Sequence, residues 1–345
     1  MSVVEHPIHH HPEAVDGLQR IFRSGGRGLR ERMTRVERHL ELVTAEAGEP
    51  LASLANSTVT SGGKRLRPLL VMLAAEAAGG AQATPEGEER LVRAAVAVEL
   101  VHSATLVHDD LIDGAALRRG HPTVAAQAGR RAAVATGDLL FSRAFSELAR
   151  NHDPDQLRAL SDASSALAEG ELLQREDAYC ARVSVERYLE RCALKTAALF
   201  EAACRLGALS ASERSRGLAD ALGAFARRIG LAFQVLDDVL DVSGPVERTG
   251  KPRGNDLLEG TVTLPFILAR ERVKELASID LHALSGAEQA EELCERIAAS
   301  GALEQARERA LAVVSEAKTV LARTLAGPRA VPLDLVADAV VERYN

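Results

Sequence analysis

Apolar residues recur every three or four positions along almost the whole chain, which is the spacing of one face of an α-helix. No segment shows the strict alternation of apolar and polar residues that is typical of a half-buried β-strand. Glycine and proline clusters interrupt the helical pattern at residues 61–68, 77–87, 118–123, 151–155, 242–256 and 325–332. The segments between them are each long enough for a helix, so the pattern predicts an all-α fold, a single large helical bundle.

The composition agrees with a helical fold. Tryptophan is absent and aromatic residues make up only 3% of the chain, which disfavours a strand-rich protein. The length of 345 residues allows one large domain or two smaller ones. Because no shift in composition follows the first 30 or so residues, we expect a single domain over residues 29–345. Residues 1–28, which include the stretch HPIHHHP, are expected to form a flexible N-terminal arm.

Charge and cysteine content exclude several classes of protein. The net charge of −7 argues against a nucleic-acid partner, because such proteins are usually basic. Four cysteines form no CxxC pair, which predicts reduced thiols and a cytoplasmic location. No uninterrupted apolar run approaches the roughly 20 residues that span a bilayer, so we expect no transmembrane segment.

Two segments of the chain repeat one arrangement of aspartates. Both contain Asp–Asp–apolar–apolar–Asp, as LVHDDLID at residues 106–113 and QVLDDVLD at residues 234–241. Each ends one of two long predicted helices, which cover about residues 87–111 and 212–242. In one helical bundle, this repetition predicts two matching carboxylate sites.

Aspartates four residues apart lie on the same face of a helix, so Asp109 projects beside Asp113 and Asp237 beside Asp241. Like charges at this spacing repel each other, and aspartate is a poor helix former. A solvated acidic face is the alternative, but two copies in apolar surroundings favour a bound cation. Hard carboxylate oxygens suit Mg²⁺, which fills its remaining positions with water and phosphate.

Basic residues recur close to these clusters. The segment GGKRLRP places Lys64, Arg65 and Arg67 in a glycine loop ahead of a predicted helix, where phosphate binds favourably. Each basic set alone fits a solvated loop, but together with two carboxylate clusters they predict two diphosphates held at once. The remaining candidates are Arg118 and Arg119, Lys195 and Thr196 in an apolar helix, Lys251 in a later loop, and His102 two helical turns before Asp109.

Six segments then match a known family in its own order. They are GGKRLRP (62–68), ELVHSATLVHDDLID with RRGHPT (99–123), EGELLQ (169–174), KTAALF (195–200), FQVLDDVLDVSG (233–244) and GKPRGNDLLEGTVTLP (250–265). The chain resembles the trans-isoprenyl diphosphate synthases, or polyprenyl synthetases. This resemblance implies an all-α fold around a deep central cavity, usually in a homodimer, that joins isopentenyl diphosphate to an allylic diphosphate with Mg²⁺. One departure is Thr261, because many members have lysine there.

The resemblance also implies a role for each matching residue. The residues that hold the diphosphate of isopentenyl diphosphate would be Lys64, Arg67, His102 and Arg119. Those that contact the allylic diphosphate or its reacting end would be Arg118, Lys195, Thr196, Gln234 and Lys251. The direct Mg²⁺ ligands would be Asp109, Asp113 and Asp237, supported or joined through water by Asp110, Asp238 and Asp241. The catalytic set is therefore Asp109, Asp113, Lys195 and Asp237.

Product length should depend on the helical turns ahead of Asp109. A growing tail that runs back along this helix would pass Thr105, Ala104 and Val101, at about 6 to 12 Å from the first aspartate. The resemblance implies an aromatic plug at one of the first two positions in short-chain members, so small residues there predict about 30 carbons or more. Bulky residues that would close the cavity sooner are Leu139, Leu140 and Phe141.

Three other functions fit parts of the pattern. A farnesyl or geranylgeranyl diphosphate synthase would share every motif and differ only in product length. A class I terpene cyclase also uses an aspartate-rich helix with Mg²⁺, but it needs one diphosphate and usually carries a different second metal motif. A non-catalytic partner subunit typically lacks one aspartate cluster, whereas both are intact here.

Overall fold

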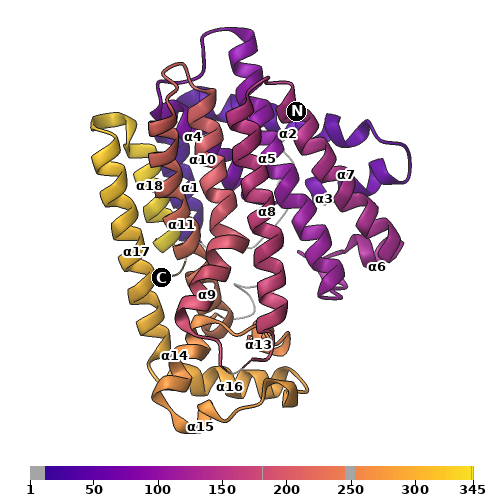
Figure 1. The fold of residues 1–345 in the computed structure, drawn as a ribbon, viewed down its shortest axis with the longest axis vertical. Coiled ribbons are helices and arrows are strands. Elements are labelled where there is room, and N and C mark those ends of the chain that lie inside the picture. Colours follow the sequence, from indigo (N-terminus) through magenta and orange to yellow (C-terminus); the bar gives the residue numbers. More distant parts are fainter. Residues whose placement is uncertain (1–11, 181, 245–252, 343, 345) are drawn as a thin grey trace.

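The computed structural model describes residues 12–180, 182–244, 253–342 and 344, and these residues are almost entirely helical (Figure 1). This confirms the predicted all-α fold. The elements are α1 (Pro12–Ser24), α2 (Gly26–Ala45), α3 (Leu51–Thr60), α4 (Leu66–Ala77), α5 (Pro85–Ile112), β1 (Leu117–Arg118), β2 (His121–Pro122), α6 (Val124–Ala128), α7 (Arg130–Ala149), α8 (Pro154–Asp177), α9 (Val185–Cys192), η1 (Ala193–Ala197), α10 (Ala198–Ser210), α11 (Arg216–Ser243), α13 (Asn255–Leu258), α14 (Leu264–Arg272), α15 (Lys274–Ala277), η2 (Leu281–Ala283), α16 (Ala287–Ala299), α17 (Ala302–Thr324), η3 (Gly327–Arg329) and α18 (Val331–Glu342). The short strands β1 and β2 pair as an antiparallel hairpin.

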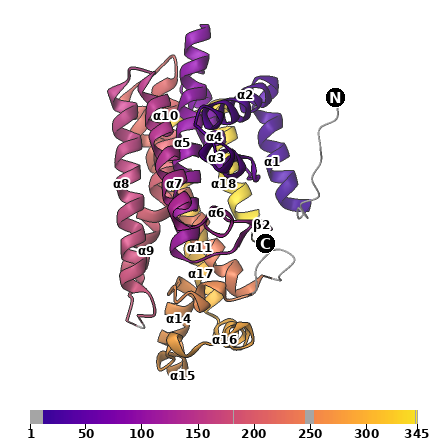
Figure 2. The same cartoon turned by 90° about the vertical axis from the view of Figure 1, so that its right-hand side faces the viewer.

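Helix α10 lies inside the bundle, where it packs against α4, α5, α8 and α11. The long helices run in similar directions, while α14, α15 and α16 gather at one end of the molecule (Figures 1 and 2). Phe200 and Cys204 of α10 are fully buried, as is Phe225 of α11. Burial of these side chains stabilises the bundle and fixes how the site-bearing helices lie relative to one another.

Helices α5 and α11 confirm the two long helices that lead into the aspartate clusters. Helix α5 begins with Pro85, and the Thr84 hydroxyl accepts a hydrogen bond from the Gly87 amide at 3.0 Å. Helix α11 begins in the same way, with the Ser215 hydroxyl accepting from the Leu218 amide at 3.1 Å. Each helix therefore has a defined start, and its opposite end carries the carboxylates.

The expected arm of residues 1–28 is wrong for its second half. Residues 12–24 form α1, which packs against α18, and Ile21 is fully buried. Arg20 Nη1 also lies 2.6 Å from Glu342 Oε1 on α18. A short polar segment becomes an ordered helix here because its apolar face has a distant partner, which the sequence pattern does not reveal. Residues 1–11 lie outside the described residues.

Helix α5 is, among the described residues, long and apolar enough to cross a membrane by length and composition. However, 78% of its most apolar window is buried inside the fold. This burial is typical of a core helix. The four cysteines are free thiols, as expected, and three of them are buried.

Candidate active site

The first aspartate cluster lies at the end of α5. Asp109 and Asp113 are one turn apart, and Asp113 is the residue that caps the helix. Burial raises the pKa of the Asp109 carboxyl to about 6. The positive charge of Lys195 opposes this rise, and the negative charge of Glu171 adds to it. Burial therefore disfavours the charged form of this carboxylate, and a bound divalent cation would stabilise that form.

Asp110 faces the interior and is only 5% exposed. Its Oδ1 accepts a hydrogen bond from Arg118 Nε at 2.7 Å, and Arg118 Nη2 lies at the same distance. A residue predicted to support metal binding is thus paired with one predicted to contact substrate. The pairing places the loop that contains β1 against the end of α5.

Two charged residues of α8, to which the sequence analysis gave no role, join the first cluster. Arg175 Nη2 donates to Asp113 Oδ1 at 2.5 Å, and its Nε donates to Glu171 Oε1 at 3.1 Å. Glu171 also forms an ion pair with Lys195. Glu171 belongs to the EGELLQ motif, one of the six segments that match the family. Its partners, however, depend on how α8 packs against η1.

Lys195 and Thr196 lie in a single π-helical turn, η1, that joins α9 to α10. Such turns hold one extra residue and are frequent at functional sites. Gly170 of α8 faces this turn, and a Cβ atom there would lie 2.6 Å from the Lys195 amide nitrogen. A side chain at residue 170 would therefore push α8 away from the turn that carries two predicted substrate contacts.

Thr196 starts a series of hydrogen bonds into the second aspartate cluster. Its hydroxyl donates to Gln234 Oε1 at 2.7 Å, and Gln234 Nε2 donates to Asp238 Oδ1 at 2.7 Å. Tyr188 Oη donates to the other carboxylate oxygen of Asp238 at 2.6 Å. Burial raises the pKa of Asp238, and these two donors oppose the shift. The carboxylate of Asp238 is thus held by the chain's own side chains.

The other aspartates of this cluster meet residues from distant parts of the chain. Tyr344 Oη donates to Asp237 Oδ1 at 3.1 Å. Asp241 Oδ2 accepts a hydrogen bond from the Asp256 amide at 3.3 Å. Burial, together with the charges of Asp241 and Asp238, raises the pKa of Asp256 well above its ordinary value. Asp256 had no predicted role, although the GND within the last matching motif contains it.

The donors in both clusters are carboxylate oxygens, the hard ligands that suit Mg²⁺. Across the part of the chain that the structure describes, no three His, Cys, Asp or Glu side chains already form a closed metal cage. Mg²⁺ does not require one, because it commonly takes one or two carboxylates and completes its shell with water and substrate phosphate. The carboxylates of Asp109, Asp113 and Asp237 are of the right chemical type for Mg²⁺ and stay its predicted ligands.

A second group of predicted site residues consists of two arginines, Arg67 and Arg119, and the neutral imidazole of His102. Burial lowers the pKa of Arg67 to about 10; Glu99 opposes the shift, and Arg119 adds to it. Burial and the charges of Arg67 and Arg119 lower the pKa of His102 well below its ordinary value. Within the described residues, Arg67 Nε is buried without a hydrogen-bond partner. This surplus of positive charge is what a diphosphate would neutralise.

Arg65, two residues earlier, has a different surrounding. Its guanidinium lies 2.7 Å from Glu37 and 2.7 Å from Glu99, and its side chain is only 10% exposed. Two carboxylates therefore compensate its charge. The surroundings thus separate Arg65, whose charge is compensated by carboxylates, from Arg67, whose buried Nε lacks a hydrogen-bond partner among the described residues.

A hydrogen bond of Arg119 connects two loops that are predicted to bind phosphate. It donates to the Gly62 carbonyl oxygen of the GGKRLRP loop, in which Lys64 is exposed. Arg65 and Arg119 both have left-handed backbone, with φ of 47° and 51°, which is uncommon for residues other than glycine. Such strain is often found at ligand sites. The last predicted substrate contact, Lys251, lies outside the described residues.

The candidate chain-length residues lie in the interior of α5. Val101 and Ala104 are fully buried, and the hydroxyl of Thr105, which is half-buried, donates to the His102 carbonyl oxygen at 2.8 Å. Helix α5 packs along α7, on which Leu140 is fully buried. A larger side chain at residue 104 or 105 would therefore have to displace or repack side chains of the neighbouring helices.

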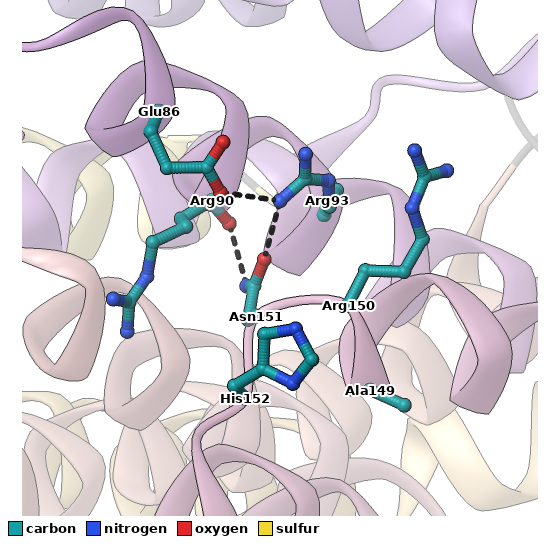
Figure 3. A pocket seen from close by; sticks show the side chains of 7 residues that line it. All are labelled: Glu86, Arg90, Arg93, Ala149, Arg150, Asn151 and His152. Carbon is teal, nitrogen blue, oxygen red and sulfur yellow. Dashed lines mark hydrogen bonds and ion pairs between the residues drawn. The ribbon is translucent and has the colours of Figure 1, made fainter.

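A pocket of about 820 Å³ lies at the opposite end of α5 (Figure 3). Arg93 Nη1 there donates to Glu86 at 2.9 Å and to the Asn151 side chain at 3.3 Å. The 16 residues from Arg93 to Asp109 span about 24 Å of helix. The pocket contains none of the predicted site residues, and we do not assign it to the active site.

The family model described as Polyprenyl synthetase matches residues 49–299. The chain belongs to the polyprenyl synthetase family. One similar relative of this polyprenyl synthetase is heptaprenyl diphosphate synthase component 2 of Geobacillus stearothermophilus, 40% identical over 71% of this chain and 75% of that protein. Another is the octaprenyl diphosphate synthase of Escherichia coli, 37% identical over 73% of this chain and 77% of that protein.

Among solved structures, the polyprenyl synthase of Caulobacter crescentus, complexed with calcium and isoprenyl diphosphate, is 34% identical with a TM-score of 0.85. The match covers 96% of this chain and 98% of that one. This polyprenyl synthetase is therefore a prenyltransferase with the all-α fold of trans-prenyl diphosphate synthases. Its family depends on divalent metal and acts on isoprenyl diphosphates.

Proposed function

We propose that this polyprenyl synthetase uses Mg²⁺ to condense isopentenyl diphosphate with an allylic diphosphate. The product would be an all-trans polyprenyl diphosphate of about 30 carbons or more, because the residues ahead of Asp109 are small and leave room for a long tail. We further propose that the enzyme works as a homodimer in the cytoplasm, without a nucleic-acid partner or a transmembrane segment.

The observation that carries the proposal is the separation of two charge environments. Asp109 lies in a buried site together with Asp113, Glu171 and Lys195, and burial is the main cause of its raised pKa. In a second site, burial and the charge of Arg119 lower the pKa of Arg67, and burial and the charge of Arg118 lower the pKa of Arg119. The first suits a diphosphate bound through metal, and the second suits a diphosphate bound by side chains. A cyclase, which handles a single diphosphate, would not need the second.

The chain's own residues would bind and orient the two substrates. Bound Mg²⁺ would add positive charge beside the departing diphosphate. Lys195 would hold the allylic diphosphate, and Arg67 and neutral His102 would hold the other one, which places the reacting carbons close together. The allylic C–O bond breaks, the isopentenyl double bond attacks the carbocation, and a proton leaves to the released diphosphate. No side-chain nucleophile is required.

The relatives differ in product length. The Geobacillus and Escherichia proteins are named for heptaprenyl and octaprenyl products, whereas a Methanosarcina mazei relative, 36% identical over 88% of this chain and 93% of that protein, is a geranylgeranyl diphosphate synthase. Ala104 and Thr105 favour the longer product, because neither carries the bulk that would close the tail path. A shorter product remains the second candidate.

The test incubates the protein with Mg²⁺, an allylic diphosphate and labelled isopentenyl diphosphate. Elongation that a chelator abolishes and fresh Mg²⁺ restores would support the proposal, and chromatography of the product would give its length. Hydrocarbon formed from the allylic substrate alone would instead indicate a cyclase. No turnover from a folded protein would indicate a subunit that needs a partner, a case of interest because the Geobacillus relative is named as one component of a synthase.

A further inference from the structure

The next-to-last residue of the sequence reaches a carboxylate of the second cluster. Tyr344 follows α18 and is only 4% exposed, and its hydroxyl donates to Asp237 Oδ1 at 3.1 Å. Its ring meets Phe233 edge-on, with the ring centroids 6.3 Å apart. Phe233 lies one helical turn before Asp237 on α11. The tyrosine therefore contacts α11 twice, through its ring and through its hydroxyl.

Aromatic contacts continue from Tyr344 toward Arg67. The rings of Phe233 and Phe200 are 5.6 Å apart, and Arg67 Cζ lies 5.0 Å from the centroid of Phe200. These distances fall in the range of favourable aromatic and cation–π contacts. A continuous series of packed side chains thus joins Tyr344 to Arg67, and Asp237 lies at one end of it.

Contacts of α18 hold Tyr344 in this place. Helix α18 packs against α1, α4, α11 and α17. Glu342, two residues before Tyr344, forms the ion pair with Arg20 of α1. The Tyr344 amide donates to the Val341 carbonyl oxygen at 3.0 Å. The tyrosine is therefore part of the packed fold.

The two adjacent aspartates each receive a tyrosine hydroxyl, but in different surroundings. Asp238 is buried and has both oxygens occupied, by Tyr188 and Gln234. Asp237 is more exposed, and the Tyr344 hydrogen bond lies on one of its oxygens. A hydrogen bond to a ligating carboxylate fixes its orientation and commonly strengthens metal binding.

We propose that Tyr344 is a positioning residue, which orients Asp237 to bind Mg²⁺ together with a diphosphate. This inference depends on the proposed function, in which Asp237 is a metal ligand. The N-terminal helix α1 then contributes to the site indirectly, because it helps to hold α18.

The test compares wild type with Tyr344→Phe, which keeps the ring and removes the hydroxyl. Tyr179→Phe is the matched control, since the Tyr179 ring stacks on His282 and the residue is not among the predicted site residues. Isothermal calorimetry would measure binding of Mg²⁺ with inorganic diphosphate. A second measurement would follow elongation against Mg²⁺ concentration, together with the KM for isopentenyl diphosphate.

We expect Tyr344→Phe to weaken binding of Mg²⁺ with diphosphate, and to raise the Mg²⁺ concentration for half-maximal activity, by about 10-fold each. The KM for isopentenyl diphosphate at saturating Mg²⁺ and the thermal unfolding temperature should stay near wild type. Tyr179→Phe should match wild type in every measurement. Unchanged or tighter binding in Tyr344→Phe would overturn the inference, as would a changed KM with unchanged metal dependence.

The two proposals fail in different ways. A wild-type protein that binds Mg²⁺ with diphosphate but never elongates would contradict the proposed function, and calorimetry of Tyr344→Phe would still test the positioning role. A wild-type protein that elongates, with a Tyr344→Phe variant of identical metal dependence, would contradict the positioning role alone.

Discussion

Arg118 donates its Nε hydrogen to Asp110 Oδ1 at 2.7 Å, and this pairing divides the first aspartate cluster into two kinds of carboxylate. Asp110 is turned inward to the arginine, whereas Asp109 lies beside Asp113, Glu171 and Lys195. The three aspartates of DDxxD thus have unequal positions, although the sequence pattern presents them alike.

Asp109→Asn should therefore cost more activity than Asp110→Asn. Under the proposed function, loss of the Asp109 charge removes a direct metal ligand that stabilises the transition state, and we expect kcat to fall by about 100- to 1000-fold. Asp110→Asn weakens the contact with Arg118 and should cost far less. Steady-state kinetics would measure both, with the exposed Asp162→Asn on α8 as control. Equal losses at residues 109 and 110 would contradict the division.

A larger side chain on α5 should shorten the product. Ala104→Phe and Thr105→Phe each place an aromatic ring on the proposed tail path, so product chromatography should show fewer added five-carbon units. Because residue 104 is fully buried, some loss of stability, about 1 to 3 kcal/mol, is expected from overpacking. Leu311→Phe, at an exposed position of α17, controls for the added ring. Unchanged product from both α5 variants would place the cavity floor elsewhere.

Arg65 and Arg67 should respond to alanine in opposite ways. Arg65→Ala leaves Glu99 buried without its partner, and should lower the free energy of unfolding by about 3 to 5 kcal/mol. Arg67→Ala removes a proposed phosphate contact and should raise the KM for isopentenyl diphosphate by about 10- to 100-fold with a smaller effect on stability. Denaturant unfolding and initial-rate kinetics on both variants would check this. A KM effect confined to Arg65→Ala would reverse the assignment.

Glu147 should make stability depend on pH at the acidic end. Its side chain lies 2.7 Å from His39 Nε2 and 3.1 Å from Arg150 Nη1, and these contacts, led by the His39 hydrogen bond, lower the pKa of Glu147 below its ordinary value of 4.5. A carboxyl with a lowered folded-state pKa contributes stability above that ordinary value and loses it as the pH falls through the folded-state value.

Glu147→Gln should accordingly be less stable than wild type at pH 7, by about 2 kcal/mol. The two should converge as the pH falls below 4.5. Denaturant unfolding at several pH values would measure the difference. Glu46→Gln is the control, because the Glu46 side chain is 61% exposed and its pair with Arg143 should contribute under about 1 kcal/mol. A difference that stays constant with pH would exclude the Glu147 charge as its source.

The helices and the aspartate clusters could be predicted from sequence because both depend on local spacing. Periodicity located α5 and α11, and the i, i+4 rule placed Asp109 beside Asp113. The basic loop was equally visible, as glycines beside arginines. The sequence could not show which of its arginines has its charge compensated by carboxylates, because Glu37 and Glu99 come from other helices.

The remaining features depend on contacts between residues far apart in the chain. Arg175 meets Asp113 across 62 positions, and Tyr344 meets Asp237 across 107. The docking of α1 onto α18 joins nearly opposite ends of the sequence. No pattern within a single segment encodes such pairs, because they follow from how the finished helices pack.

The π turn at Lys195 has a consequence for how this site can change. Successive α-helical residues are about 100° apart around the axis, so one extra residue alters the phase of everything that follows. Deletion of one residue from Ala193–Ala197 would rotate Tyr188 away from Asp238 while Phe200 kept its place in the core. A single insertion or deletion can thus rotate one half of a helix about its axis relative to the other half, while every remaining side chain keeps its chemical identity.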